Sequence, residues 1–99
     1  MLLVQRDAAG HLLGAINYEP VNATGGVDRT ITNGWLWIEQ LELSAGVDSR
    51  TVIRQFIQDI ATLNPEVQGA YWVRRDSTGD RPHWFTRSRL VQHSEEVRV

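Results

Sequence analysis

The sequence predicts a small α+β (α/β) domain in which one main amphipathic helix packs on a mixed sheet. Two features carry this prediction: β-prone runs lie on both sides of a segment whose apolar residues recur at helical spacing, and turn-forming residues separate these runs. The expected order is an N-terminal β-hairpin, a long loop, a central strand, the helix and a further strand. A strand–helix–strand unit normally closes with parallel strands, whereas a hairpin is antiparallel, so the sheet should be mixed.

The size and composition fit one globular domain. The 99 residues, of which 41% are hydrophobic and 22% charged, are enough to bury a core without disulfides or metals. We therefore expect residues 1–99 to form a single domain.

Composition also excludes several classes of protein. The chain has no cysteine, which removes disulfides, thiolate zinc sites and Cys nucleophiles and makes the reducing cytoplasm the expected compartment. No apolar run approaches the roughly 20 residues that cross a bilayer, and no basic segment precedes the first apolar residues, so neither a membrane span nor a secretion signal is expected. The formal net charge of −2 predicts no general attraction to nucleic acid.

The N-terminal third is predicted to hold a hairpin and a loop. Residues 2–6 and 11–18 are β-prone, and the segment between them ends in Gly10, which a tight turn favours. Residues 20–33 are rich in Pro, Asn, Thr, Gly and Asp and hold hardly any apolar side chains, so we expect a mobile surface loop there.

Residues 35–43 give the clearest strand prediction. Their nearly continuous apolar character indicates an inner strand that is covered on both faces. Because large aromatic side chains dominate buried packing, Trp35 and Trp37 are expected in the core.

The segment 48–63 is predicted to be an amphipathic helix. Asp48 or Ser49 can accept the first free backbone N–H groups, and Pro65 ends the helix because it disfavours helical geometry in the residue before it. One side carries Val52, Ile53, Phe56, Ile57, Ile60 and Leu63, and the other carries Arg50, Arg54, Gln55, Gln58 and Asp59.

The C-terminal third begins with a further strand. Residues 70–74 should form this strand, and residues 76–82 should form a turn or loop. For residues 83–91 a short strand and a short helix both fit the pattern. The tail 93–99 is expected to be loosely held.

A known family pattern lies over residues 41–56. The pattern L-x-V-x-P-x-x-R-G-x-G-x-G-x-x-L aligns there without a gap, and its apolar positions fall on Leu41, Leu43, Val52 and Phe56. This segment and the order of the elements resemble the core of the GNAT acyltransferases, which implies a GNAT-like fold.

The signature positions of that pattern are occupied differently here. Asp48 stands at the Arg of the pattern, and Ser49, Thr51 and Ile53 stand at its three glycines. In the family these glycines let backbone N–H groups approach the pyrophosphate of acyl-CoA, which side chains would obstruct and a carboxylate would repel. We therefore expect this loop not to bind acetyl-CoA in the family's usual way.

Residues 2–7, 34–39 and 73–76 carry a second resemblance. They are similar to segments of the toxin-activating lysine acyltransferases, GNAT relatives that use acyl carrier protein in place of CoA. That family uses a His and an Asp, and the resemblance implies Glu39 as the matching acid and candidate base. The family's His lies in an N-terminal helical region without a counterpart here. His83 could take the place of that His only if folding brings it close to Glu39.

The alternation of side chains along a strand bears on the role of Glu39. With a period of two residues, Glu39 lies on the same face as Trp37, Leu41 and Leu43, where shielding from water would suit a general base. The alternative is that Glu39 pairs with an Arg or lies at a bulged or frayed point that faces water.

Cations and aromatic rings alternate in the C-terminal third. This combination can bind phosphate groups and stack on bases or on a phosphopantetheine arm. The alternative is a solvated basic face, balanced by nearby acids, whose tryptophans point into the core. The three His residues show no ligand spacing, so no metal site is predicted. The candidate ligand-binding residues are Arg74, Arg75, Arg81 and Trp84.

Three functions are open from the sequence. The first is a small acyltransferase-like protein, active or with reduced or lost catalysis, whose donor is acyl-CoA or acyl carrier protein. The second is a non-catalytic homodimer or protein-binding module that uses an exposed strand edge or the Trp and Arg surface. The third, nucleic-acid binding through the Arg and Trp region, is disfavoured by the negative net charge. Whether the chain is an enzyme is left open.

Overall fold

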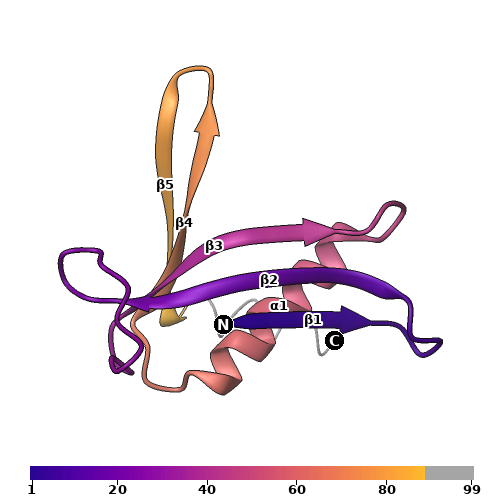
Figure 1. The fold of residues 1–99 in the computed structure, drawn as a ribbon, viewed down its shortest axis with the longest axis horizontal. Helices are drawn as coiled ribbons and strands as arrows, with labels where there is room; N and C mark the ends of the chain where they lie inside the picture. The colour runs from indigo at the N-terminus through magenta and orange to yellow at the C-terminus, as the bar shows by residue number, and fades with distance from the viewer. Residues whose placement is uncertain (89–99) are drawn as a thin grey trace.

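The computed structural model describes residues 1–88, except for the side chains of Arg75 and Asp76. Their strands form one sheet in the order β1-β2-β3-β4-β5 (Figure 1). The expectations for residues 89–91 and 93–99 lie outside the described residues. The elements are β1 (Leu2–Arg6), β2 (Leu12–Val21), β3 (Trp35–Leu43), α1 (Ser49–Leu63), β4 (Gly69–Asp76) and β5 (Gly79–Thr86).

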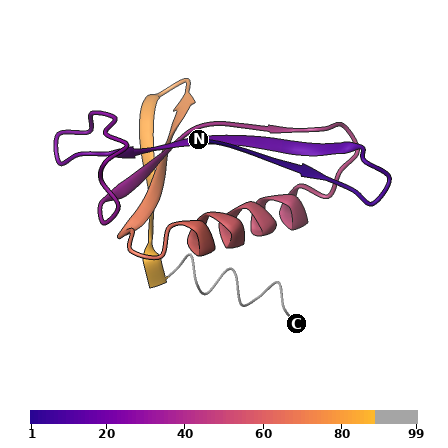
Figure 2. The ribbon, with the colours of Figure 1, turned by 60° about the horizontal axis from the view of Figure 1, so that its bottom comes forward.

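The sheet is mixed, as the sequence predicts. β3 and β4 are parallel, and the other neighbouring strands are antiparallel. Helix α1 lies along one face of the sheet (Figure 2). The α+β class, the N-terminal hairpin and the helix between two parallel strands are therefore confirmed.

A short turn joins β1 to β2. The Asp7 carboxylate oxygen Oδ1 accepts hydrogen bonds from the backbone N–H groups of Ala9 and His11, both 2.9 Å long. Gly10 has a φ of 87°, a conformation that residues with a side chain rarely adopt. Local bonds between side chain and backbone therefore fix the turn that the sequence predicts.

β2 is longer than predicted, which shortens the loop that follows. The sequence places Pro20 and Val21 in the loop, but both belong to β2, and Val21 is only 4% exposed. That boundary is wrong because the turn-forming residues around Val21 hide a β-branched side chain that packs well on a sheet. Asn22 begins the loop, where its Oδ1 accepts hydrogen bonds from the N–H groups of Thr24 (3.0 Å) and Gly26 (2.9 Å). The mobility of the remaining loop stays a prediction.

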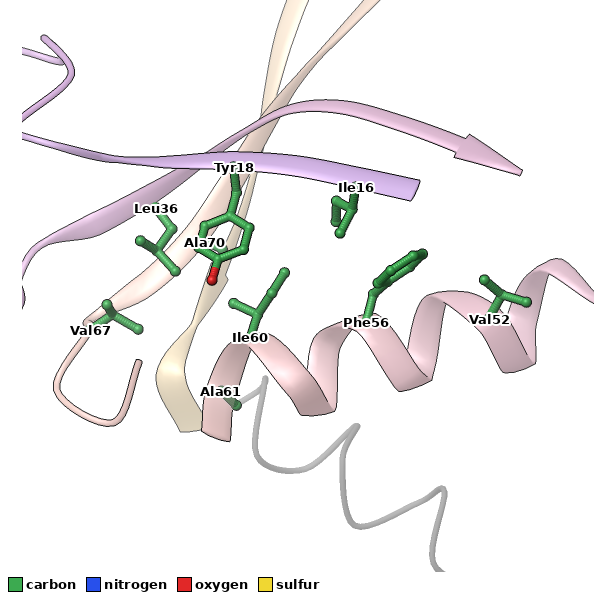
Figure 3. Close-up of a cluster of buried hydrophobic side chains, with 9 residues drawn as sticks. All are labelled: Ile16, Tyr18, Leu36, Val52, Phe56, Ile60, Ala61, Val67 and Ala70. Atoms are coloured by element: carbon green, nitrogen blue, oxygen red, sulfur yellow. The ribbon is translucent and has the colours of Figure 1, made fainter. Parts of the chain in front are cut away.

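The core lies between α1 and the sheet (Figure 3). Val52, Phe56 and Ile60 are each at most 4% exposed and follow one stripe of the helix at a spacing of four residues. They pack with Ile16 and Tyr18 of β2. The amphipathic helix is therefore confirmed. The buried cluster also contains Leu36, Ala61, Val67 and Ala70.

Polar side chains lie at both ends of α1. Asp48 occupies the N-cap position, but its carboxylate accepts a hydrogen bond from the Thr51 hydroxyl (2.9 Å) in place of the predicted bond from the helix backbone. This bond lowers the pKa of Asp48. At the other end, Nδ2 of Asn64 donates to the Ile60 carbonyl (2.9 Å) and to the Tyr18 hydroxyl (3.1 Å). The predicted limits of the helix are confirmed, and the predicted capping bond is wrong.

β4 and β5 form a second hairpin, which replaces most of the loop predicted for residues 76–82. Ser77 and Thr78 alone separate the two strands, and Gly79 has a φ of 116° where the tight turn closes. The loop prediction is wrong because Pro82 indicates a break, whereas an edge strand tolerates Pro since one side of its backbone needs no partner. For residues 83–86 the strand alternative is correct.

Glu19 is a buried carboxylate that joins β2 to the loop after it. It is 7% exposed. Arg29 donates two hydrogen bonds to it, from Nε to Oε2 and from Nη2 to Oε1, and the N-terminal ammonium of Met1 donates a third, all 2.9 Å long. Arg29 first, and then the ammonium, lower the pKa of Glu19 to about 2. Because it is paired in this way, the carboxylate stays ionised on a buried strand.

We predict that Glu19 makes the stability of the fold depend on pH in the acid range. Its pKa of about 2 lies below its ordinary value of 4.5, so the ionised carboxylate stabilises the fold above about pH 4.5, and this contribution is lost as the pH falls toward 2. Urea unfolding of the wild type and of Glu19→Gln over this range should show a difference in stability that is widest near neutral pH and narrows in acid. A difference that stays constant with pH would contradict this role.

Candidate functional site

A pocket opens where β3 and β4 separate. The two strands pair at only three positions, Trp35 with Gly69, Leu36 with Ala70 and Trp37 with Tyr71. Beyond these pairs β3 continues along β2, while the hairpin of β4 and β5 turns away from it (Figure 1). We call this hairpin the arm. Diverging parallel strands expose the residues between them, so the fold creates a space beside α1.

This pocket has a volume of about 660 Å³ and is bounded by β3, α1 and the arm. Its wall is mostly apolar, and Ile38, Ile53, Ile57, Trp72 and Phe85 contribute to it. An apolar concave surface with few polar groups is the usual form of a small-molecule site. The polar residues that line it are Glu39, Gln40, Ser49, Arg50 and Arg54.

Helix α1 presents a second stripe to this pocket, beside the stripe that packs into the core. Arg50, Ile53, Arg54 and Ile57 stand at positions i, i+3, i+4 and i+7, which share one side of a helix, and all line the pocket. The sequence pattern groups Arg50 and Arg54 on the polar side of the helix, opposite the apolar side chains; in the structure both line the pocket, Arg54 half-buried and Arg50 exposed. Arg50 and Arg54 could have been identified as pocket residues from their spacing relative to Ile53 and Ile57, because these four residues share one face of a helix.

Glu39 lies at a β-bulge on the wall of the pocket. Asn17 of β2 is opposite Gln40, and Tyr18 is opposite Ile38, so Glu39 has no partner of its own. Glu39 is exposed, and its Oε2 accepts a hydrogen bond from Nδ2 of Asn17 (2.9 Å). The expectation of a shielded carboxylate is wrong, and the alternative of a bulged residue that faces water is correct.

The bulge also explains why simple alternation fails along β3. Before it, Leu36 and Ile38 face α1 and contact the core. After it, Leu43 contacts the same core, and Leu41 is paired with the buried Ile16. One extra residue therefore shifts the alternation, so that Leu41 and Leu43 lie on the opposite face from Trp37.

His83 is not assembled with Glu39. Its ring stacks on Trp72 with centroids 5.4 Å apart, and Trp72 in turn stacks on Phe85 at 4.6 Å. Nε2 of His83 is buried and has no hydrogen-bond partner among the described residues. Trp72 and Phe85 line the pocket, whereas His83 does not. The two candidate catalytic residues thus do not line one pocket.

The candidate ligand-binding residues are divided between the two faces of the arm. Arg74 and Arg81 are exposed and opposite one another near its tip, where Nη2 of Arg81 donates to the Thr78 hydroxyl (2.9 Å). They share the face of Trp72, since residues two apart on a strand point the same way. Trp84 lies on the other face, and the side chain of Arg75 lies outside the described part of the structure. Arg74, Arg81 and Trp84, whose side chains are described, do not line the pocket.

Aromatic rings occupy the sheet face opposite α1. Trp84 is 51% exposed, stacks on Tyr71 with centroids 4.3 Å apart, and meets Trp35 edge-on at 5.0 Å. Trp37 lies beside Tyr71 in the same row of the sheet. Trp35 and Trp37 are half-buried, so the prediction that they belong to the core is wrong. β3 is covered by α1 on one face, while its other face belongs to this group, which we call the aromatic face: Trp35, Trp37, Tyr71 and Trp84.

The described residues contain no group of three or more His, Cys, Asp or Glu side chains that could hold a metal ion. Helix α1 is also too short and too polar to span a membrane, and no other helix of residues 1–88 qualifies.

No known protein family, no characterised protein and no solved structure matches this chain.

We predict that Gly69→Ala destabilises the fold by about 1–3 kcal/mol, because overpacking at a closely packed position forces the backbone to move. A Cβ atom at Gly69 would lie 2.6 Å from the Trp35 ring and closer still to the Phe85 carbonyl oxygen. Gly26→Ala is the matched control, since a Cβ atom there would lie 3.2 Å or more from its nearest neighbour, the side-chain amide of Asn22. Urea unfolding should separate the two variants. Equal stability of both would show that Gly69 does not constrain Trp35.

Proposed function

We propose that this chain is a small acyltransferase-like protein, related to the GNAT enzymes, that binds an acyl group carried on a pantetheine arm and has reduced or lost catalysis. The pocket between the diverging parallel strands β3 and β4 is the observation that carries the proposal. A long thioester-linked chain is extended and largely apolar, and this pocket is mostly apolar and is lined by residues of both strands.

The helix N-terminus supports acyl carrier protein over acyl-CoA as the donor. Ser49 and Thr51 are exposed side chains where the GNAT pattern has glycines. The pKa of Asp48 is lowered, first by the Thr51 hydroxyl, so a negative charge stands at the position where a pyrophosphate would approach. A carrier protein presents its pantetheine arm without a nucleotide, so no pyrophosphate has to approach the N-terminus of α1.

Reduced catalysis agrees with the surroundings of the candidate base. In acyl transfer the acceptor amine attacks the thioester carbon, a base takes the proton from the amine, the C–S bond breaks, and the departing thiolate receives that proton. Glu39 is the carboxylate on the pocket wall, but it is exposed and bonded to Asn17. His83, on β5 of the arm, does not line the pocket, and its ring stacks on Trp72.

We predict that acyl carrier protein loaded with an acyl group raises the melting temperature of the chain more than acyl-CoA does, because binding to the folded state stabilises it. If acyl transfer occurs, we predict that Glu39→Gln lowers the rate of transfer by roughly 10²-fold or more while the donor still binds. Glu42→Gln, an exposed carboxylate further along the same strand, is the matched control. Unchanged turnover in Glu39→Gln would remove Glu39 as the base, and no response to either donor would refute the proposal.

The aromatic face favours a second candidate function, that of a homodimeric interaction module. Exposed aromatic surface of this kind is enriched at protein interfaces. The acid beside it, Glu19 in the same row as Trp37, is paired with Arg29 and with the N-terminal ammonium, so the aromatic face brings no unpaired carboxylate of Glu19 to an interface. A twofold dimer would cover the same patch on both copies.

We predict that Trp84→Ala converts such a dimer into a monomer, because a central exposed aromatic residue carries a large share of an interface. Light scattering coupled to size exclusion gives the mass of each variant in solution. Leu63→Ala is the matched control, since Leu63 is 57% exposed but lies at the end of α1, away from the aromatic face. A wild-type monomer at all concentrations, or a dimer that survives Trp84→Ala, would exclude this interface.

A further inference from the structure

We infer that the edge of β3 beside the pocket binds an extended peptide segment of another protein, which adds to the sheet as a strand and places alternate apolar side chains in the pocket. This goes beyond acyl transfer, because it requires neither an acyl donor nor a catalytic base.

Along its second half, β3 has an edge that no strand of residues 1–88 covers. β2 pairs with β3 from Trp35 to Leu43, but β4 pairs with it only as far as Trp37 and then turns away with the arm (Figure 1). Residues 38–43 therefore have β2 as their one neighbour among the described strands. The backbone N–H and C=O groups of such an edge are a template for pairing with another chain.

The backbone groups of Leu41 and Leu43 point to this edge. The N–H of Ser44, the next residue, donates to the Leu13 carbonyl of β2 (3.0 Å), so Ser44 is bonded toward β2. Residue pairs of an antiparallel ladder alternate between pairs that exchange hydrogen bonds and pairs that do not. Leu43 and Leu41 therefore belong to pairs that do not, and their N–H and C=O groups point away from β2, into the gap that β4 leaves.

The pocket borders the edge of β3 and not only one of its faces. Residues 38–41 are consecutive, and all of them line the pocket. Because consecutive side chains of a strand point to opposite faces, consecutive residues line one space where that space lies beside the edge. Trp72 and Val73 of β4 line the pocket in the same way from the arm. A strand added to β3 would thus have the pocket directly beside it.

Apolar side chains at the edge remain uncovered. Leu41 is 39% exposed although its partner on β2 is the buried Ile16, and Val73 is 42% exposed. Both line the pocket, so a ligand there would remove apolar surface from water. A hydrocarbon chain would cover these side chains but would offer nothing to the backbone groups of Leu41 and Leu43. An extended peptide offers apolar side chains on one face and N–H and C=O groups along its edge, which favours a peptide as the ligand.

The test uses acetylated and amidated peptides and the whole protein. The parent peptide is Lys-Val-Thr-Val-Thr-Val-Lys, in which valines alternate with threonines and the lysines keep the peptide in solution. Two derivatives each carry two N-methyl groups, one on both threonines and the other on the last two valines. Methylation removes N–H donors and leaves every side chain unchanged. Because N–H groups of alternate residues point to opposite edges of a strand, one derivative loses its bonds to β3 and the other keeps them.

Calorimetric titration should show that the parent peptide binds, and that one derivative binds about tenfold or more weakly while the other binds within about threefold of the parent. Equal binding of both derivatives, whether retained or lost, would overturn the inference. So would the absence of binding by the parent peptide.

A variant of β3 places the peptide on this edge. Leu41→Pro removes one N–H group from the edge, a change that a strand tolerates where it has no neighbour. Leu41→Ala is the matched control, since it shortens the same side chain and keeps the N–H. The parent peptide should bind Leu41→Pro about fivefold or more weakly than Leu41→Ala, because a bond is lost and the proline ring obstructs the approach. Equal affinity would refute this edge as the site. If circular dichroism shows Leu41→Pro to be unfolded, the two methylated peptides decide the question on the wild type.

Two further measurements separate this inference from other occupants of the edge. A concentration-dependent dimer in light scattering that the parent peptide does not dissociate would assign the edge to a second copy of the chain and overturn the inference. Peptide binding without any response to acyl donors would support this site and refute the proposed transferase. A response to acyl donors without peptide binding would refute this site and leave the transferase standing.

Discussion

The short parallel contact between β3 and β4 is the constraint on which the rest of the structure depends. Three residue pairs hold the arm to the body of the sheet. The contact can form only because Gly69 leaves room for the Trp35 ring and the Phe85 backbone, both of which a Cβ atom at this position would meet. Had the strands paired along their full length, β4 would have covered the wall of β3 that now lines the pocket. The place where pairing stops therefore decides where a ligand can enter.

The sheet separates two kinds of surface because side chains alternate between its faces. On the side of α1, Ala70 and Trp72 continue from the core into the pocket. On the other side, Tyr71 stacks on Trp84, which is exposed. Consecutive residues of β4 thus face the pocket on one side and the aromatic face on the other. A ligand in the pocket and a partner on the aromatic face would share a backbone without competing for the same side chains.

Local signals were sufficient for most of the fold. Gly10 after a polar segment, the apolar stripe of α1 and Asn64 before a proline identify the first hairpin and both limits of the helix. The candidate site was harder to predict from the sequence, because it depends on where β3 and β4, which are distant in the chain, diverge. Arg50 and Arg54 have the same spacing whether a helix stripe faces solvent or a pocket, and only the position of β4 distinguishes the two cases. Pro82 led to the wrong prediction of a loop for a related reason. A strand tolerates proline at this position because β5 lies at the edge of the sheet.

The single unpaired residue in β3 has a consequence for how this strand can vary. It changes the parity of the strand, so that odd-numbered positions contribute to the aromatic face before Glu39 and to the core side after it. Removing this extra residue would restore a regular strand in which Leu41 and Leu43 still lie on the core side, opposite Ile16 and Gly14 of β2. The face that Leu41 and Leu43 occupy therefore depends on how many residues separate them from Ile38, and not on which side chain stands at position 39.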